Sequence, residues 1–181
     1  MRVVGGTARG RRLVAPPGGR TRPTGDRVRE AIFNALWSRG ALDGARVLDL
    51  FAGSGALGIE ALSRGAAHAT FVEADRAARR AIATNLETCG FTDRADVVAA
   101  PVGRFLDRLV HERSGDSVAF DLAFCDPPYA FDGWDDLVAR VPAPLVVIEA
   151  GHPVRPPAGW QMERESCYGD TWVGFVSRSP T

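Results

Sequence analysis

The sequence contains no lysine: all 22 of its basic residues are arginine. Such a bias can follow genome composition, so the identity of a single arginine carries little weight. Cysteine is scarce, and the three that occur are widely spaced and odd in number, which argues against a disulfide framework, a zinc site or a redox dithiol. The three histidines show no ligand-like spacing either. We therefore expect no metal site, and a reducing compartment, the cytoplasm.

Long apolar runs are absent too. The longest of them, such as residues 145–148, fall far short of the ~20 residues that a membrane-spanning helix needs. Residues 1–6 lead into arginines without an apolar stretch, so they do not resemble a secretory signal. With 45% hydrophobic and 24% charged residues in a chain of 181, we expect one globular domain that folds alone, is not bound to a membrane and acts as a monomer.

Acidic and basic residues balance over the whole chain but not along it. Residues 1–39 hold nine arginines and two acids, a net charge of +7, and the rest of the chain carries −7. Glycines and prolines surround the first arginines and favour exposed guanidinium groups, which can neutralise RNA phosphates. We therefore predict a basic N-terminal arm or hairpin over residues 1–24 and a main domain over 25–181, with RNA contacts from Arg9, Arg11, Arg12, Arg20, Arg22 and Arg27.

From residue 45 on, apolar runs alternate with alanine- and arginine-rich stretches, a pattern typical of parallel strands joined by crossover helices. The pattern predicts strands over residues 46–50, 69–73, 95–99, 119–125 and 145–149. Helices are expected over residues 25–38, 56–64, 75–88, 102–112 and 133–140. Two further strands, 160–167 and 172–177, are joined by Tyr168-Gly169-Asp170 without a helix. The predicted fold class is α/β, a mostly parallel sheet with a final antiparallel pair.

The most informative motif is VLDLFAGSGALG at residues 47–58: a strand, a tight glycine turn and the start of a helix. Glycines let a ligand approach the backbone, and the helix N-terminus supplies unpaired N–H groups. Glu73 ends the next strand, twenty residues after Gly53, where an acid can bind the two hydroxyls of an adenosine ribose. The pattern predicts a site for an adenosine-containing cofactor.

The glycine motif allows three interpretations: a dinucleotide site, a site for S-adenosylmethionine, or a turn that only packs a helix on a sheet. Asp49 favours the second, because a carboxylate just before the turn repels a pyrophosphate and attracts an ammonium or sulfonium group. The third leaves the acids at positions 49 and 73 without a role. The residues expected to bind S-adenosylmethionine are Asp49, Phe51, Ala52, Gly53, Gly55, Gly58, Glu73 and Ala74.

A second motif, Asp126-Pro127-Pro128-Tyr129, follows the fourth predicted strand and supplies the candidate catalytic residues. Ligands of open parallel sheets bind beyond the carboxyl ends of the strands, so this motif should stand beside the glycine turn. Two prolines stiffen the backbone and leave carbonyl oxygens as acceptors. The Asp126 carboxylate and the Pro127 carbonyl can accept the hydrogens of a base amine and direct its lone pair at a methyl donor, while Tyr129 stacks on the base. The alternative is an ordinary turn with Tyr129 in the core.

Together the two motifs resemble the amino-methyltransferases of nucleic acids, and other segments narrow the resemblance. Residues 2–6 (RVVGG), 10–13 (GRRL), 22–24 (RPT), 27–34 (RVREAIFN) and 168–171 (YGDT) resemble the RsmD family of 16S ribosomal RNA guanine-N2 methyltransferases. The match covers nearly the whole chain. The resemblance implies a seven-stranded, Rossmann-like class I methyltransferase fold, S-adenosylmethionine as cofactor, and methylation of guanine 966 of 16S ribosomal RNA in an assembling small subunit.

One position departs from related methyltransferases, which often place Asp or Asn after the third strand to meet the adenine amine: here it is Pro101. Adenine recognition must then rest on apolar or backbone contacts. Two other functions remain open. A DNA adenine or cytosine amino-methyltransferase shares the tetrapeptide, although 181 residues leave no room for a large target-recognition domain. A non-catalytic RNA-binding assembly factor would leave the intact motif at residues 126–129 unexplained.

Overall fold

The structure is a computed structural model that describes residues 1–17, 25–112 and 120–179. Its elements are α1 (Asp26–Ser38), β1 (Arg46–Leu50), α2 (Ala56–Ser63), β2 (His68–Val72), α3 (Arg76–Cys89), a short 3-10 turn (Thr92–Arg94), β3 (Ala95–Val98), α4 (Val102–Glu112), β4 (Leu122–Cys125), α5 (Trp134–Arg140), β5 (Leu145–Ala150), β6 (Trp160–Tyr168) and β7 (Thr171–Arg178). Among the described residues no helix is long and apolar enough to cross a membrane.

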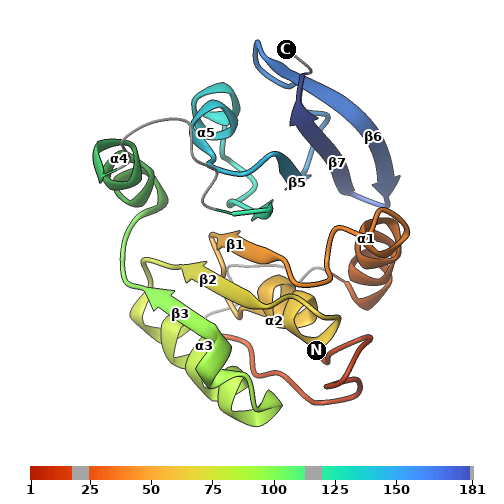
Figure 1. Cartoon of the computed structure of the whole chain (residues 1–181), viewed down its shortest axis with the longest axis vertical. Helices are drawn as coiled ribbons and strands as arrows, with labels where there is room; N and C mark the ends of the chain where they lie inside the picture. Colours follow the sequence, from red (N-terminus) through yellow and green to blue (C-terminus); the bar gives the residue numbers. More distant parts are fainter. Residues whose placement is uncertain (18–24, 113–119, 180–181) are drawn as a thin grey trace.

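The seven strands form one sheet in the order β3-β2-β1-β4-β5-β7-β6 (Figure 1). β1 to β5 are parallel, and β7 runs antiparallel to both β5 and β6. Leu50 is in register with Val72 on one side and with Cys125 on the other, so Glu73 and Asp126 leave the sheet at the same edge. The chain order reverses between β1 and β4, and such a switch point is where open α/β sheets bind their ligands.

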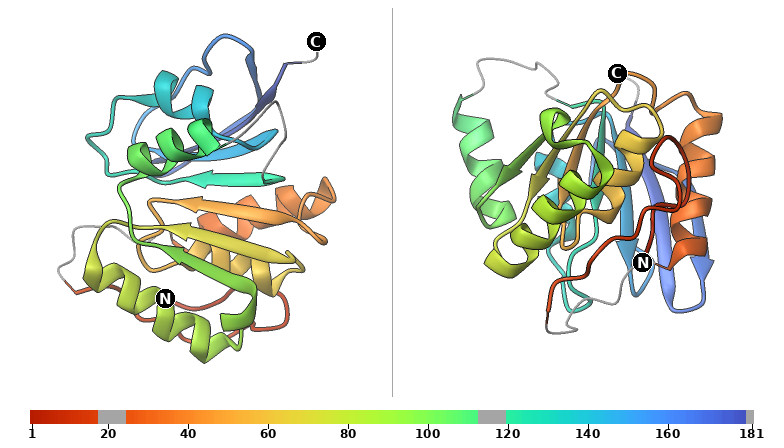
Figure 2. Two further views of the ribbon diagram at one scale, coloured as in Figure 1. Left: turned by 60° about the vertical axis from the view of Figure 1, so that its left-hand side comes forward. Right: turned by 90° about the horizontal axis from the view of Figure 1, so that it is seen from below.

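Helices cover both faces of the sheet (Figure 2). One face is packed by α1, α2 and α3, which contact strand residues such as Val47, Phe71 and Phe124. The other face is packed by α4 and α5 over residues such as Leu48 and Ile148. Successive strand residues point to opposite faces, and both faces are buried here, which explains why the parallel strands read as continuous apolar runs.

Residues 1–14 form a hairpin that lies along α2 and is closed by a backbone bridge between Arg2 and Arg12 (Figure 1). The backbone N–H groups of Val4 and Gly5 each donate to the fully buried carboxylate of Glu60 at 2.7 Å. A charge-assisted pair of hydrogen bonds of this kind is roughly twice as strong as a neutral pair. The hairpin is therefore fixed to the second helix rather than projecting into solvent.

A side-chain amide fixes the other end of the hairpin. Asn85 of α3 accepts the Val14 N–H at 2.8 Å, donates to the Val14 carbonyl at 3.0 Å and donates to the Ser54 carbonyl at 2.9 Å. Three hairpin side chains also belong to the core: Val3, Ala8 and Leu13. The predicted hairpin is thus present, and it is packed into the main domain. The predicted boundary between residues 24 and 25 lies at the end of a segment, residues 18–24, that falls outside the described part of the chain.

The predicted strands and helices agree with the structure except near their ends. β2 begins and ends one residue earlier than expected, and the side chain of Glu73, just beyond the strand, accepts the Gly53 N–H of the glycine turn. β4 begins at Leu122, while residue 119 of the predicted strand falls outside the described residues. Asp75 caps α3 by accepting the N–H of Ala78 at 2.8 Å, and Gly90, with a φ of 74°, ends that helix. The final antiparallel pair is confirmed.

Candidate active site

The glycine turn between β1 and α2 has an unusual backbone. Phe51, Gly53 and Gly55 all have positive φ angles, of 60°, 56° and 76°. Glycine adopts this region freely, whereas a bulky residue such as Phe51 does so only when its surroundings force it. Gly58 is required for a different reason: a Cβ there would lie 2.4 Å from a ring carbon of Phe71. The motif therefore bends the chain sharply and brings α2 close to the sheet.

Two acidic side chains hold this turn from the sheet side. Asp49 Oδ2 accepts the N–H of Gly58 at 2.9 Å. Glu73 Oε2 accepts the N–H of Gly53 at 2.9 Å, and its Oε1 accepts the N–H of Asp75 at 2.8 Å. An ionised carboxylate has about four acceptor sites, so these bonds do not exhaust Glu73. It can hold the turn and still accept two ribose hydroxyls.

The electrostatics of the turn decide which ligand suits it. Asp49 is only 1% exposed, and this burial raises the pKa of its carboxyl well above the ordinary value. The Gly58 hydrogen bond lowers that pKa, while the charges of Asp126 and Glu73 raise it further. The negative charges of Asp126 and Glu73 thus act on the buried Asp49 at the carboxyl ends of β1, β2 and β4. A positively charged ligand relieves this repulsion, and a pyrophosphate worsens it. The residues present therefore fit S-adenosylmethionine and not a dinucleotide.

The other predicted members of the cofactor site lie around the same turn. Ala52 is buried and donates its N–H to the Val72 carbonyl at 3.2 Å. Ala74 is exposed, and its carbonyl accepts a guanidinium N–H of Arg79 at 2.5 Å. Pro101, which departs from related sequences, is exposed just before α4 and supplies no side-chain polar group. The turn thus offers a cofactor backbone and carboxylate groups, and the nearby Pro101 adds an apolar surface.

The tetrapeptide after β4 stands next to this turn. Asp126 is half-buried and Pro127 is buried, whereas Pro128 and Tyr129 are exposed. The Pro128 carbonyl accepts the N–H of Phe131 at 2.8 Å, but among the described residues no donor reaches the Pro127 carbonyl. Tyr129 is 56% exposed, which contradicts the alternative interpretation that it is a core residue. The loop therefore presents an acceptor group and an aromatic ring to its surroundings.

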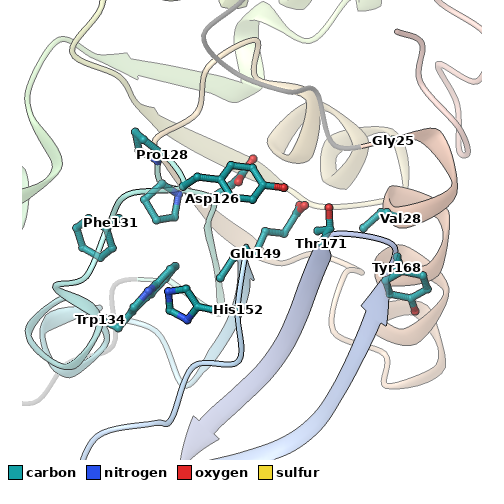
Figure 3. A pocket seen from close by; sticks show the side chains of 14 residues that line it. Gly25, Val28, Asp126, Pro128, Phe131, Trp134, Glu149, His152, Tyr168 and Thr171 are labelled. Carbon is teal, nitrogen blue, oxygen red and sulfur yellow. The ribbon is translucent and has the colours of Figure 1, made fainter.

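A cavity of about 140 Å³ opens beside the tetrapeptide (Figure 3). An apolar cavity of about 150 Å³ can hold one benzene molecule, so this space is of the size of a flat ring. Its lining residues come from the tetrapeptide loop, the start of α1, the end of β5 and the β6–β7 turn: Gly25, Val28, Asp126, Pro127, Pro128, Tyr129, Phe131, Trp134, Glu149, Ala150, Gly151, His152, Tyr168 and Thr171. We refer to it as the base pocket.

Aromatic contacts connect the glycine turn to the base pocket. The rings of Phe51 and Phe131 meet edge to face with centroids 5.7 Å apart, and Phe131 meets Trp134 in the same way at 5.1 Å. Such pairs contribute about 0.5–1.5 kcal/mol each beyond the area they bury. The unusual φ of Phe51 thus places a ring between the two motifs. Sequence reasoning assigned Phe51 to the cofactor only and missed this contact.

Ten of the fourteen residues that line the base pocket were not predicted as site residues, and Glu149 and Thr171 are two of them. Glu149 is 4% exposed at the end of β5, and Thr171 begins β7. A signal for Glu149 was present, because it is the one acid in the apolar run at residues 145–150. Cys125 lies beside Asp126. The pKa of its thiol is raised chiefly by burial, and the charges of Asp49 and Asp126 raise it further. It stays protonated, as expected of a packed strand-end thiol.

Four of the six predicted RNA-binding arginines lie on the N-terminal hairpin and on the first turn of α1. Arg9, Arg11, Arg12 and Arg27 are all exposed. Arg9 and Arg27 line one depression of about 310 Å³ between the hairpin and α1. A third arginine, Arg2, and two acids, Asp26 and Glu30, line the same depression. The other two predicted arginines, Arg20 and Arg22, lie outside the described residues. The structure thus brings two members of the set together on one surface.

The sheet order, the glycine turn with its acids and the adjoining tetrapeptide define an S-adenosylmethionine-dependent methyltransferase of class I. A family model described as "Conserved hypothetical protein 95" matches residues 1–177, and the chain belongs to this family, the RsmD family.

Individual relatives agree with this assignment. YlbH of Bacillus subtilis (strain 168) is 45% identical over 129 residues, which cover 71% of this chain and 67% of that protein. Ribosomal RNA small subunit methyltransferase D of Escherichia coli (strain K12) is 37% identical over an alignment of 192 positions, covering 98% of this chain and 90% of that protein. The solved structure of yhhF from Escherichia coli superposes with a TM-score of 0.82 at 35% identity, covering 100% of this chain and 99% of that one.

Proposed function

We propose that the protein methylates the exocyclic N2 amine of a guanine in small-subunit ribosomal RNA, the guanine that corresponds to position 966 of 16S ribosomal RNA. The observation that carries the proposal is the junction of two sites. The buried carboxylate of Asp49, with the charges of Glu73 and Asp126 acting on it, suits a cationic methyl donor, and a rigid acceptor loop with a ring-sized pocket stands directly beside it. The relative named ribosomal RNA small subunit methyltransferase D, which this chain matches over 98% of its length, supports the choice of RNA.

The chain's own residues orient the target amine. The Asp126 carboxylate and the Pro127 carbonyl accept the two amine hydrogens, which turns the nitrogen lone pair toward the methyl donor. S-adenosylmethionine, when bound at the glycine turn and Glu73, supplies an electrophilic methyl group. As the amine nitrogen becomes positive, its hydrogen bonds to Asp126 strengthen, and this lowers the barrier. The same carboxylate can take the proton that the amine loses. Tyr129 holds the base by stacking, which is worth about 1–3 kcal/mol per base.

The exposed arginines of the hairpin and α1 bind the phosphates around the target. The hairpin that carries Arg9 is anchored through Glu60, and Arg27 lies on α1, so a phosphate bound between them is held at a fixed distance from the base pocket. A rigid basic surface of this kind suits folded RNA better than a flexible single strand. We therefore propose that the protein acts in the cytoplasm, as a monomer, on an assembling small subunit.

Product analysis on small subunits tests the reaction. Subunits from a strain that lacks this enzyme, incubated with the protein and S-adenosylmethionine, should yield N2-methylguanosine in a nucleoside digest analysed by mass spectrometry. N6-methyladenosine or N4-methylcytidine instead would assign the chain to the DNA-type amino-methyltransferase chemistry. No methylated nucleoside at all would favour the non-catalytic assembly factor.

A pair of variants tests the site. Asp126→Ala should lower the single-turnover rate by ~10²–10⁴ and leave the affinity for S-adenosylmethionine within about threefold, because its partner is the target amine. Asp132→Ala removes an exposed acid six positions later that does not line the base pocket, and it should behave as wild type. Full activity of Asp126→Ala would refute the acceptor loop.

A further inference from the structure

The base pocket contains a second carboxylate besides Asp126. Glu149 is the penultimate residue of β5, is 4% exposed and lines the same cavity as Asp126 and Tyr129. Pairing of Glu149 with Val173 of β7 fixes its backbone in the middle of the sheet. Glu149 makes an interaction within the protein, and it shares the wall of this cavity with Asp126 and Tyr129. Its place in that wall points to a use within the pocket.

The sheet order places three oxygen-bearing side chains in a row. β4, β5 and β7 are neighbours, and at the edge that carries the pocket they contribute Asp126, Glu149 and Thr171. Figure 3 shows the two carboxylates and the threonine hydroxyl turned toward one space, with Glu149 between the other two. The YGDT turn of the sequence thus supplies one wall of the pocket through its first and last residues.

The hydrogen-bonding groups of the bases decide which base this row of three side chains can bind selectively. Three bases carry an exocyclic amine. In adenine and cytosine, the ring nitrogen beside that amine on the Watson–Crick edge is an acceptor. In guanine it is N1–H, a donor, and the next group is the O6 acceptor. A carboxylate accepts hydrogen bonds and cannot donate them when ionised, whereas a hydroxyl can do both.

We infer that Glu149 is the residue that selects guanine, by accepting the N1–H beside the amine that Asp126 holds. This rests on the proposed function, and it names the base that the site admits. With N2 at Asp126, N1–H meets Glu149 and O6 meets the hydroxyl of Thr171. Adenine or cytosine in the same position turns a ring lone pair toward the Glu149 carboxylate and is repelled. Thr171 does not discriminate, because its hydroxyl serves a donor or an acceptor equally.

The test changes the ring nitrogen and leaves the methylated amine in place. 2,6-Diaminopurine carries the same N2 amine as guanine, but its N1 is an acceptor. Small-subunit RNA with one 2,6-diaminopurine at the methylated position is made by ligation and assembled with ribosomal proteins. Wild-type enzyme should methylate guanine at least about 100-fold faster than the analogue in single turnover, the range for a site built around a substrate N–H. Equal rates would overturn the assignment.

Glu149→Gln separates base selection from support of the fold. Its amide keeps the shape of the side chain and can turn an N–H toward the ring acceptor, so the preference for guanine should fall at least about tenfold. A variant that loses the same factor with both substrates, total loss included, would make Glu149 a structural residue and overturn the inference. Glu60→Gln is the matched control: it neutralises another buried glutamate, one that does not line the base pocket, and should keep the wild-type ratio.

These outcomes are distinct from failure of the proposed function. That function fails if wild-type enzyme yields no N2-methylguanosine on ordinary subunits. The present inference fails when guanine is methylated and the analogue is methylated at an equal rate, or when Glu149→Gln loses the same factor with both substrates, total loss included.

Discussion

The contact between Tyr129 and Gly151 provides a sharp test of the base pocket. A Cβ added at Gly151 would lie 2.5 and 2.6 Å from two carbons of the Tyr129 ring. Carbon atoms prefer separations of about 3.5–4.0 Å, so Gly151→Ala must displace the ring by about 1 Å. Tyr129 is 56% exposed and can move outward at little cost to the fold. Gly151→Ala therefore changes mainly the position of the Tyr129 ring.

The size of the effect follows from that displacement. A misplacement of about 1 Å at a reacting centre can cost ~10²-fold, or about 2.7 kcal/mol at 1.36 kcal/mol per tenfold. This lies within the ~1–3 kcal/mol of one base–aromatic stack. We expect kcat/KM for small subunits to fall by ~10- to 100-fold. Titration calorimetry should show unchanged affinity for S-adenosylmethionine, and urea unfolding should show a free energy within about 1 kcal/mol of wild type.

Gly103→Ala is the control, because it also replaces a glycine but has open space around the new Cβ. Gly103 lies inside α4, where alanine is favoured by up to ~1 kcal/mol, so the control should be slightly more stable and fully active. In a Tyr129→Ala background, Gly151→Ala should have no further effect on activity. An undiminished kcat/KM for Gly151→Ala, or an additive loss in the double variant, would show that the ring does not hold the base.

Three further predictions concern the cofactor turn and the basic surface. Glu73→Ala should weaken S-adenosylmethionine binding by ~1.5–3 kcal/mol in calorimetry, and unchanged affinity would mean that the ribose is held elsewhere. Because burial raises the pKa of Asp49 above 3.8, its contribution to stability is present at lower pH and is lost as the pH rises through the folded-state pKa. Asp49→Asn should therefore flatten the fall in unfolding free energy above about pH 4 while weakening cofactor binding, and a pH profile identical to wild type would contradict this. Replacing Arg9, Arg11 and Arg12 together by alanine should flatten the salt dependence of subunit binding by roughly two to three units and spare cofactor affinity. Equal salt slopes would show that the hairpin does not touch phosphate.

Features with a local cause could be predicted from the sequence. The helix expected over residues 75–88 is α3, which Asp75 caps and Gly90 ends, because a cap acts within one turn of its own helix. The glycine turn and the tetrapeptide were placed correctly at one edge of the sheet, since parallel strands align their carboxyl ends. The antiparallel end of the sheet followed from the short YGD connection.

Features that depend on distant partners could not be predicted. Glu60 looks like a surface residue of a short helix, yet it accepts hydrogen bonds from residues more than fifty positions earlier. The role of Glu149 in the pocket depends on the position of β7 beside β5, which brings Thr171 to the same pocket. Neither strand order nor side-chain burial across 20 to 60 residues is encoded in a local pattern, so both residues were missed.

The strand order also places the cofactor site and the base pocket on two different lengths of the chain. The donor side is built by β1, β2 and the helix α2 between them, whereas the base pocket is closed by β5 and by the hairpin of β6 and β7 at the end of the sheet. A change in that terminal hairpin can therefore alter which nucleoside enters without disturbing the methyl donor. Grafting the β6–β7 hairpin and the end of β5 between relatives that act on different bases offers a direct route to enzymes of altered target, built on one unchanged donor half.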